Sequence, residues 1–294
     1  MASDKRPSGL PSWWKSGDTD MGRNYALGER LTALPAERMA EMSGLPQSTT
    51  RVTVLDNACG NGIVTQIVFD AFGEDQRARL QVTAGDFSPS MVNVAKERIV
   101  KNNWTSQAKA DIIDMQDMRM LQPDTFTHVL TNFGIGFPPD SDKALREISR
   151  VLVSGGVNAF TNWQSIGWIP ITSAAIDTIP GCPKFPSSEE LLDAMQHKRP
   201  WHDHAYIERA LKEHGFDEVQ VEEHVKTHVF DADSFVHMFG GPMIQAMASS
   251  FWSKEDLQKY GSQVAPALKK YLQDNGQQEI SFLMIANIAV AKKA

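Results

Sequence analysis

The chain has 294 residues, a formal net charge of −7 and 41% hydrophobic residues, which suits one large domain or a domain with a smaller cap. The acidic balance and the lack of a Lys/Arg stripe argue against a nucleic-acid partner, because binding to a phosphate backbone needs a basic face. No stretch approaches the roughly 18 apolar residues of a membrane span, and the N-terminus lacks the apolar core of a signal peptide. We therefore expect a cytoplasmic protein with no membrane partner. Two cysteines without a Cys/His cluster predict no metal site.

The first part of the chain alternates strands with helices. Residues 51–56 form a β-branched run that ends in an acid, and residues 63–72 follow with helical spacing. Residues 80–86 repeat the strand pattern, and Ser88 and Pro89 then begin a second helix as N-cap and first helical residue. This order favours parallel strands with right-handed crossovers, so ligands are expected at the carboxyl edge of the sheet.

The alternation continues towards the end of the chain. Further strands are expected at residues 108–113, 126–132, 157–163, 219–229 and 279–292. One helix is expected over residues 142–152, closed by Gly155 and Gly156, and another over residues 203–214, ending at Gly215. We predict an α/β fold with a doubly wound, seven-stranded, mainly parallel sheet, a terminal hairpin and helical lid insertions.

Four regions follow from this plan. They are an N-terminal helical cap, a ligand-binding core, a substrate-cap insertion, and the C-terminal part of the sheet with a second helical insertion. Their expected bounds are residues 1–50, 51–163, 164–202 and 203–294, with the second insertion at residues 231–275. Trp13, Trp14 and a helix over residues 25–42 fall in the first region. We expect both insertions to cover the carboxyl edge of the sheet.

The stretch VLDNACGNG, residues 54–62, ends the first strand in a glycine turn. A dinucleotide fingerprint would need a third glycine where Ile63 stands, and a P-loop would need Lys and Ser/Thr after Gly62. Neither motif is present. Asp56 would repel a pyrophosphate and attract a ligand that carries an ammonium or a sulfonium, so we expect a partly cationic ligand.

The acids near the ends of the next two strands indicate which other groups this ligand carries. Asp86, at the end of the second strand, can accept hydrogen bonds from both hydroxyls of a ribose. Asp114, after the third strand, can accept from the exocyclic amino group of adenine, while Phe87 and Met91 offer flat and polarizable surface to the ring. Cation, ribose and adenine together describe S-adenosylmethionine.

Five stretches then carry a family resemblance. In chain order they are VLDNACGNG, AGDFSPSMVNVAKER, ADIIDMQDMRML, FTHVLTNFGI and ALREISRVLVSGGVNAFTNW. In order and spacing, over roughly residues 50–163, they resemble the successive motifs of class I S-adenosylmethionine-dependent methyltransferases with a Rossmann-like fold. The resemblance is to the small-molecule branch of quinone-pathway and fungal secondary-metabolite enzymes. It implies transfer of a methyl group from S-adenosylmethionine to an O, N, C or S atom, with S-adenosylhomocysteine as product.

The resemblance also implies cofactor contacts. The implied residues are Tyr25, Asp56, Ala58, Gly60, Gly62, Asp86, Phe87, Met91, Asp114, Met115, Asn132 and Phe133. Ala58 stands where the family usually has its first glycine, and because alanine has the smallest side chain we expect binding to survive. Asp111 or Asp117 would replace Asp114 if the register shifts by three residues.

Catalytic residues are less clearly signalled. Displacement at a sulfonium needs chiefly alignment, and it needs a base only if the nucleophile starts protonated. His202 and His237 are the candidate general bases, with a structural role as the alternative for each. We expect His128 in the core, and Cys59 as a small buried residue rather than a nucleophile.

Apolar residues of the two insertions favour a pocket for an aromatic or isoprenoid-like substrate. They are Trp168, Ile169, Ile171, Phe239, Met243, Met247, Phe251 and Trp252. Trp163 and Trp168 either pack in the core or wall this pocket. The fourth strand lacks the Asn-Pro-Pro-Tyr type signature of amide and nucleobase methylation, which disfavours macromolecular targets. Two alternatives remain, a cofactor-dependent rearrangement or cyclisation without methyl transfer, and a non-catalytic regulator. No oligomeric state is predicted.

Overall fold

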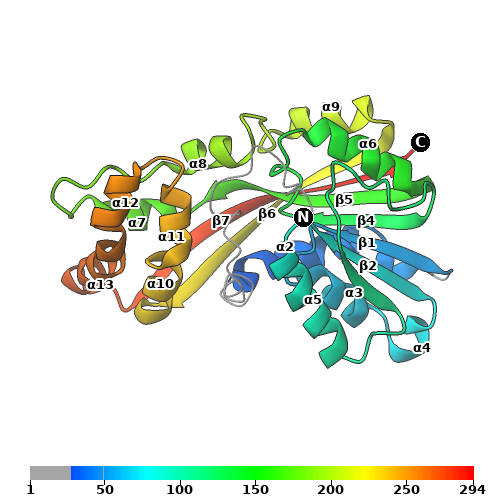
Figure 1. The fold of residues 1–294 in the computed structure, drawn as a ribbon, viewed down its shortest axis with the longest axis horizontal. Coiled ribbons are helices and arrows are strands. Elements are labelled where there is room, and N and C mark those ends of the chain that lie inside the picture. Colours follow the sequence, from blue (N-terminus) through cyan, green and yellow to red (C-terminus); the bar gives the residue numbers. More distant parts are fainter. Residues whose placement is uncertain (1–27, 49) are drawn as a thin grey trace, which may run out of the picture.

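A seven-stranded sheet runs through the computed structural model, which describes residues 28–48 and 50–294. The strand order is β3-β2-β1-β4-β5-β7-β6 (Figure 1). The strands are β1 Val52–Asn57, β2 Leu80–Asp86, β3 Ala108–Ile112, β4 Phe126–Asn132, β5 Leu152–Ile166, β6 Phe216–Asp231 and β7 Glu279–Lys293. Strands β1 to β5 pair in parallel, and β7 lies antiparallel between β5 and β6. The predicted doubly wound, mainly parallel sheet is confirmed.

Helices bury separate apolar clusters against this sheet. Their bounds are α2 Glu29–Met42, α3 Ile63–Ala71, α4 Glu74–Arg77, α5 Pro89–Lys101, α6 Ser141–Val151 and α9 His204–Glu213, with a short 3-10 turn, η3, at Leu45–Gln47. Helices α2, α3 and α5 contribute to one buried cluster, and α6 and α9 to another. The stacked rings of Phe69 and Trp104, with centroids 4.3 Å apart, belong to the first cluster. This arrangement leaves the carboxyl ends of β1, β2 and β4 free to form a site.

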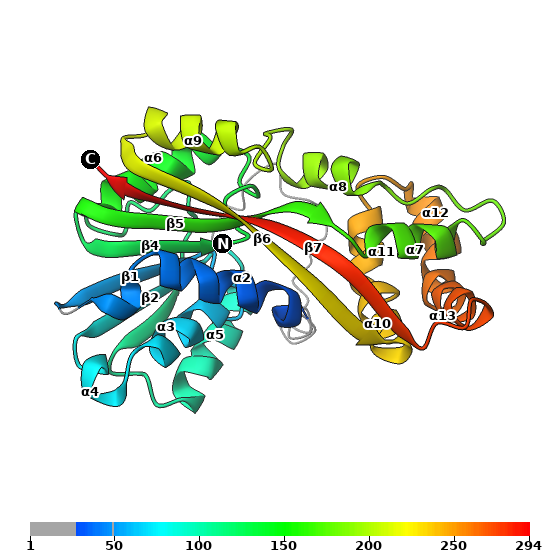
Figure 2. The ribbon, with the colours of Figure 1, turned by 180° about the vertical axis from the view of Figure 1, so that it is seen from behind.

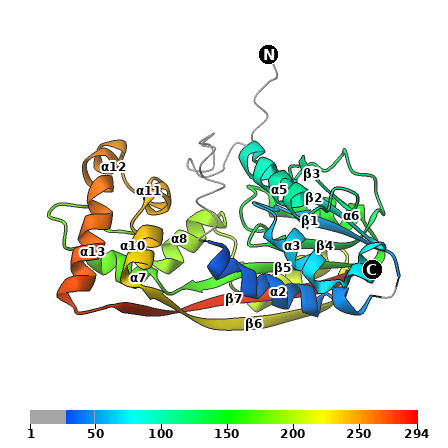
Figure 3. The same ribbon diagram turned by 90° about the horizontal axis from the view of Figure 1, so that it is seen from below.

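The last three strands extend beyond the parallel part of the sheet and carry a helical cap (Figure 3). The cap comprises α7 Ile169–Ile176, α8 Ser188–Met195, α10 Ala232–Phe239, α11 Pro242–Ala248, α12 Lys254–Tyr260, the 3-10 turn η4 Gly261–Gln263 and α13 Val264–Asp274. Its buried cluster includes Phe230, Phe235 and Phe282, whose ring centroids lie 5.6 to 6.5 Å apart. The cap therefore has a hydrophobic core of its own.

Helix α2 contacts both the turn after β1 and the antiparallel strands of the sheet (Figure 2). At its start, Glu29 accepts hydrogen bonds from Asn61 in the turn after β1 and from Arg98 on α5. Further along, Arg38 donates to both carboxylate oxygens of Glu222 on β6, at 2.8 and 2.7 Å. The helix thus contacts both the turn after β1 and the extended strands.

Two local expectations were wrong: the place where the helix after β4 ends, and the residue at which the next strand begins. Gly155 and Gly156 do not close the helix after β4, because α6 ends at Val151 and both glycines lie in β5. The register of the β4–β5 pair shifts between Phe126 and His128, so this glycine pair marks an irregularity in a strand rather than a helix end. Strand β5 is consequently longer than expected.

Within the described ranges, no helix has the length and apolar character needed to cross a membrane.

Candidate active site

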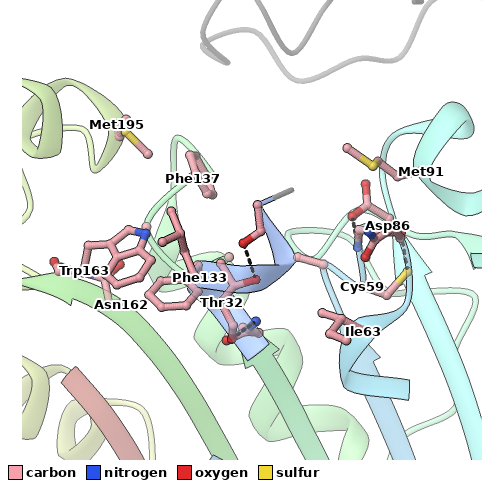
Figure 4. A pocket seen from close by; sticks show the side chains of 18 of the residues that line it. Thr32, Cys59, Ile63, Asp86, Met91, Phe133, Phe137, Asn162, Trp163 and Met195 are labelled. Atoms are coloured by element: carbon pink, nitrogen blue, oxygen red, sulfur yellow. Dashed lines mark hydrogen bonds between the residues drawn. The ribbon is translucent and has the colours of Figure 1, made fainter. Parts of the chain in front are cut away.

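A cavity of about 430 Å³ lies where the carboxyl ends of the parallel strands meet the cap. We call one side the turn wall, formed by Ala58, Gly60, Asn61, Asp86, Phe87, Met91, Asp114 and Met115. The opposite side, the cap wall, is formed by Asn162, Trp163, Trp168, Met195, Gln196, His237, Met238, Met243, Met247 and Met284. Figure 4 shows Asp86 and Met91 facing Trp163, Asn162 and Met195 across the cavity. The loop after β4 lies between the two walls.

The turn after β1 is built from left-handed backbone. Ala58, Gly60 and Gly62 have φ angles of +54°, +52° and +84°. A side chain in this conformation costs roughly 1–2 kcal/mol relative to glycine, so the alanine that departs from the family pattern carries strain. The turn is held in place by the N–H of Gly60, which donates to Asp86 Oδ2 at 2.9 Å.

Asp86 is 3% exposed and joins the ends of β1 and β2. Its Oδ1 accepts from the N–H of Ser88 at 2.9 Å, while its Oδ2 accepts from Gly60. Burial raises the pKa of Asp86 to about 6, against the lowering effect of these two hydrogen bonds. A carboxylate offers about four acceptor positions, so this group can still accept from two hydroxyls.

Asp56 and Gly62 lie behind the turn rather than on the cavity lining. Asp56 is fully buried, and its Oδ2 accepts from the N–H and the hydroxyl of Thr65 at 2.9 and 2.6 Å. Burial raises the pKa of Asp56 to about 7. Its Oδ1 has no hydrogen-bond partner among the described residues. In this conformation Asp56 anchors the first turn of α3, and direct contact with a ligand stays a prediction.

Cys59 is 3% exposed, which confirms the expected small buried residue. Burial, followed by the neighbouring carboxylates Asp56 and Asp86, raises the pKa of its thiol well above the usual range. The thiolate is the nucleophilic form, so this cysteine is not suited to attack a substrate.

The loop after β4 packs tightly against the turn. A Cβ atom added to Gly134 would lie 2.7 Å from the Cβ atom of Ala58, so glycine is required there. The neighbouring Phe133 has a φ angle of +54° and stacks on Trp163, with centroids 4.0 Å apart. Its N–H donates to the hydroxyl of Thr161 at 2.9 Å. Strand β5 thereby fixes the loop between the two walls.

Of the three acids considered in and after β3, the structure places Asp114 on the cavity lining. Its Oδ1 accepts from the N–H of Gln116 at 2.9 Å. Asp111 pairs with Lys109 at 3.0 Å, and Asp117 pairs with Arg119 at 2.6 Å, both outside this cavity. The unshifted register is therefore the one that brings a carboxylate to the cavity.

The three histidines considered from the sequence lie in different surroundings. His237 lines the cavity from α10, whereas His202 does not line it. The carbonyl of His202 accepts from Asn287 Nδ2 of β7 at 2.9 Å, which holds this segment away from the site. His128 is 8% exposed and burial lowers its pKa to about 4, as expected for a core residue. Tyr25, Trp13 and Trp14 lie outside the described residues.

The cap wall is rich in methionine. Met195, Met238, Met243, Met247 and Met284 line it, together with Trp163 and Trp168. Four other residues expected in this pocket do not line the cavity. Ile169, Phe239 and Trp252 belong to the buried cluster of the cap, and Ile171 packs against it. Phe251 is 40% exposed. These four contribute to the core of the cap, while methionine and tryptophan side chains form the pocket surface.

The segment after α8 is strained. Gln196 ends this helix, and the next two residues, His197 and Lys198, have φ angles of +52° and +60°. Conformations of this kind cost about 1–3 kcal/mol each. His197 Nε2 lies 3.0 Å from the carbonyl oxygen of Phe137, and Arg199 donates to Asp142 at 2.7 and 3.0 Å. These contacts hold Gln196 against the cavity.

Sequence reasoning missed Asn61, Asn162, Met195 and Gln196. Asn61 lies inside the glycine-turn motif and could have been considered there. The other three reach the cavity through the packing of α8 and β5, and no local pattern indicates it. Within residues 28–48 and 50–294, the ionisable side chains that line the cavity are Asp86, Asp114, His237 and Cys59, with no lysine or arginine.

Comparison with known proteins decides the family. A model of a methyltransferase domain matches residues 54–156. Acetylaranotin bis-thiomethyltransferase of Aspergillus terreus is 30% identical over 256 residues, covering 87% of this chain and 87% of the relative. Methyltransferase tpcH of Aspergillus fumigatus is 31% identical over 250 residues, covering 85% of this chain and 87% of the relative. The chain belongs to the class I S-adenosylmethionine-dependent methyltransferases.

Solved structures agree with the fold of this methyltransferase. The YcgJ protein of Bacillus has a TM-score of 0.53 at 14% identity, with 87% of this chain and 97% of that chain covered. Phosphoethanolamine N-methyltransferase 2 of Haemonchus contortus, in complex with S-adenosyl-L-methionine, has a TM-score of 0.50 at 20% identity, with 92% of this chain and 52% of that chain covered. The fungal relatives favour methyl transfer over the alternative of a rearrangement.

The turn wall of the methyltransferase fits the cofactor. Asp86 keeps free acceptor positions for ribose hydroxyls, and Asp114 lies nearby on the same wall. Met91 and Phe87 supply apolar and aromatic surface for an adenine ring. No cation on this wall would repel a sulfonium, because the ionisable side chains there are acidic or neutral.

Proposed function

We propose that this methyltransferase acts on a small, neutral and largely apolar organic molecule held between the turn wall and the cap wall. One observation carries the proposal: a cavity joins Asp86 and Asp114 to a surface of methionine and tryptophan, and the described residues that line it include no lysine or arginine. Among these described lining residues an anionic acceptor would find no cationic partner. An apolar one would bury its surface against the cap wall.

The cofactor is proposed to occupy the turn wall. Asp86 would accept from the ribose, Asp114 from the adenine amino group, and Asn132 would lie near the methionine end. The other implied contacts are Ala58, Gly60, Phe87, Met91, Met115 and Phe133, all of which line the cavity. Thr161 supports this end, because its hydroxyl donates to Asn132 Oδ1 at 2.6 Å.

The bound cofactor supplies a methyl group that is electrophilic because it is attached to a sulfonium. The chain then needs to align the acceptor and exclude water, which the two walls accomplish together. His237 is the proposed general base for an acceptor that keeps its proton, because its imidazole lines the cavity from α10 and an imidazole can accept a proton. A thiol or a phenol, with pKa values near 8.5 and 10, would need less help than an alcohol.

The relatives suggest a place in secondary metabolism. The Aspergillus terreus relative is named for methyl transfer to sulfur, so we place a thiol first among acceptor groups and a phenol second. The expected cytoplasmic location stays a prediction, which fractionation of cells that carry the tagged chain would test.

A methyl-transfer screen tests the proposal. Purified protein with S-adenosylmethionine is incubated with matched aryl thiols, phenols and anionic phosphoesters, and the masses of the products are measured. We expect a gain of one methyl group on neutral thiols or phenols and none on the phosphoesters. Methylation confined to the phosphoesters would contradict the assignment of a neutral substrate.

A further inference from the structure

Gln196 is a buried polar side chain on the cap wall whose oxygen has no partner. The residue is 4% exposed, and its Oε1 accepts no hydrogen bond from any described residue. Roughly 90% or more of buried polar groups in proteins are hydrogen-bonded, so an unpaired amide oxygen beside a cavity needs an explanation. An amide oxygen is only an acceptor, and the missing partner is therefore a donor.

The position of Gln196 is enforced by its surroundings. The two residues that follow it are strained, and His197 Nε2 lies 3.0 Å from the carbonyl oxygen of Phe137. A Cβ atom added to Gly136 would lie 3.0 Å from Gln196 Cγ, so the glycine makes room for this side chain. Strain persists only where contacts enforce it, and it concentrates at functional sites.

The chemistry of the neighbouring surface narrows the donor. Leu192 and Met195 line the cavity from the same helix as Gln196, and the described cavity residues include no lysine or arginine. A cationic donor would lose its hydration here without a carboxylate from α8 to replace it. A neutral O–H or N–H fits both the apolar neighbours and the single acceptor.

We infer that Gln196 is a specificity-determining residue, which accepts a hydrogen bond from a neutral O–H or N–H group of the acceptor molecule. The inference rests on the proposed function, because it names a chemical group of the molecule held by the cap wall. Molecules of the same shape that lack the donor leave the oxygen unpaired and bind more weakly.

The test compares two probes on two proteins. Binding of 2-naphthol and of 2-methoxynaphthalene, which lacks the donor, is measured by calorimetry on protein loaded with S-adenosylhomocysteine. We expect Gln196→Met to reduce the preference for 2-naphthol over its methyl ether by about threefold to tenfold, the size of one hydrogen bond. Methionine keeps the length of the side chain and removes the acceptor, so the variant should not have a lower Tm.

Gln164→Met is the matched control. Gln164 on β5 also has a buried amide oxygen without a partner, but it does not line the cavity. This variant should leave the preference between the two probes unchanged. An equal change in both variants, or an unchanged preference with a lower Tm in Gln196→Met, would overturn the inference.

Gly136→Ala provides a second variant that keeps the amide. Its added methyl group would displace the Gln196 side chain, so the preference for 2-naphthol should fall here too. If loaded wild-type protein binds neither probe, the proposed apolar substrate is contradicted and the inference falls with it. If both probes bind and the preference is the same in all variants, only the inference falls.

Discussion

The two walls of the cavity are built in different ways. The turn wall depends on backbone: left-handed turn residues, and N–H groups of Gly60 and Ser88 that donate to one carboxylate. The cap wall depends on side chains from distant parts of the chain, half of them methionines with several rotatable bonds. This difference fits the proposal that the turn wall, the rigid half, holds the cofactor, and that the cap wall, the adaptable half, holds a variable substrate. The methyltransferase domain match, over residues 54–156, covers the first half and stops before the cap.

Loss of Asp86 should have the largest effect on the rigid half. Asp86→Ala removes an acceptor for ribose hydroxyls and two hydrogen bonds that hold the turn, so S-adenosylhomocysteine binding should weaken by about tenfold to a hundredfold. Calorimetry measures this. Asp111→Ala, which removes an acid of β3 outside the cavity, is the control and should bind normally. Equal affinities for the two variants would show that Asp86 does not hold the cofactor.

Gly134→Ala tests the contact between the loop and the turn. The added Cβ atom would overlap Ala58 and also lie 2.9 Å from Thr131 Cγ2, so both segments must move. We expect the free energy of unfolding to fall by about 1–3 kcal/mol, as for other overpacked positions. Gly73→Ala, where a Cβ atom meets open space, should change it by less than about 0.5 kcal/mol. Denaturant unfolding of the two variants measures these free energies. A Gly134→Ala protein as stable as Gly73→Ala would contradict the tight contact between the loop and the turn.

Cofactor binding should depend on pH through Asp86. Its folded pKa is raised to about 6, so the carboxyl is protonated below that pH and ionised above it. Only the ionised form accepts from two hydroxyls with both oxygens. Affinity for S-adenosylhomocysteine should therefore rise with pH, and be about tenfold weaker near pH 5 than near pH 8. In Asp86→Asn this dependence should flatten, and a wild-type affinity that is constant over this range would exclude the link.

Ionisation of the two buried acids should also lower stability. Because burial raises the folded pKa values of Asp56 and Asp86 to about 7 and 6, above the ordinary value, the protonated forms favour the folded state. The stabilisation of the folded state by these protonated carboxyls is present at low pH and is lost as pH rises from about 4 through 7. The unfolding free energies of wild type and Asp86→Asn should be measured over this range. As pH rises, the value for wild type should fall relative to the value for the variant.

Methionine substitutions on the cap wall should have the smallest effect on the rigid half. Met243→Leu with Met247→Leu nearly conserves volume, so unfolding should change by less than about 1.5 kcal/mol and cofactor affinity by less than about twofold. Branched leucines adapt less readily, so the range of methylated acceptors should narrow. A large loss of cofactor affinity would mean that the two walls are not independent, and would break the comparison.

The same division decides what could be predicted from the sequence. Asp86 and Gly60 were identified because their roles depend on a turn that the local motif encodes. Gln196 could not be, because it reaches the cavity only through the docking of α8 against the loop after β4. His202 looked equivalent to His237, but His237 lines the cavity from α10, whereas the backbone of His202 is held by Asn287 on a distant strand. Gly155 and Gly156 resembled a helix end because a strand irregularity uses the same residue type.

The pairing of β6 with β7 has a consequence for how this enzyme can diversify. The pairing persists to the last residue before the cap helices, where Asp231 lies opposite Glu279. Helices α10 to α13 therefore leave and rejoin the sheet at neighbouring positions, and the entropy of closing such an excursion grows only slowly with its length. A whole helical segment can be exchanged, lengthened or grafted between homologues at this junction while the strands stay in register. A single recombination can thereby replace the part of the cap wall that carries His237, Met238, Met243 and Met247, while the rest of the cavity stays in place.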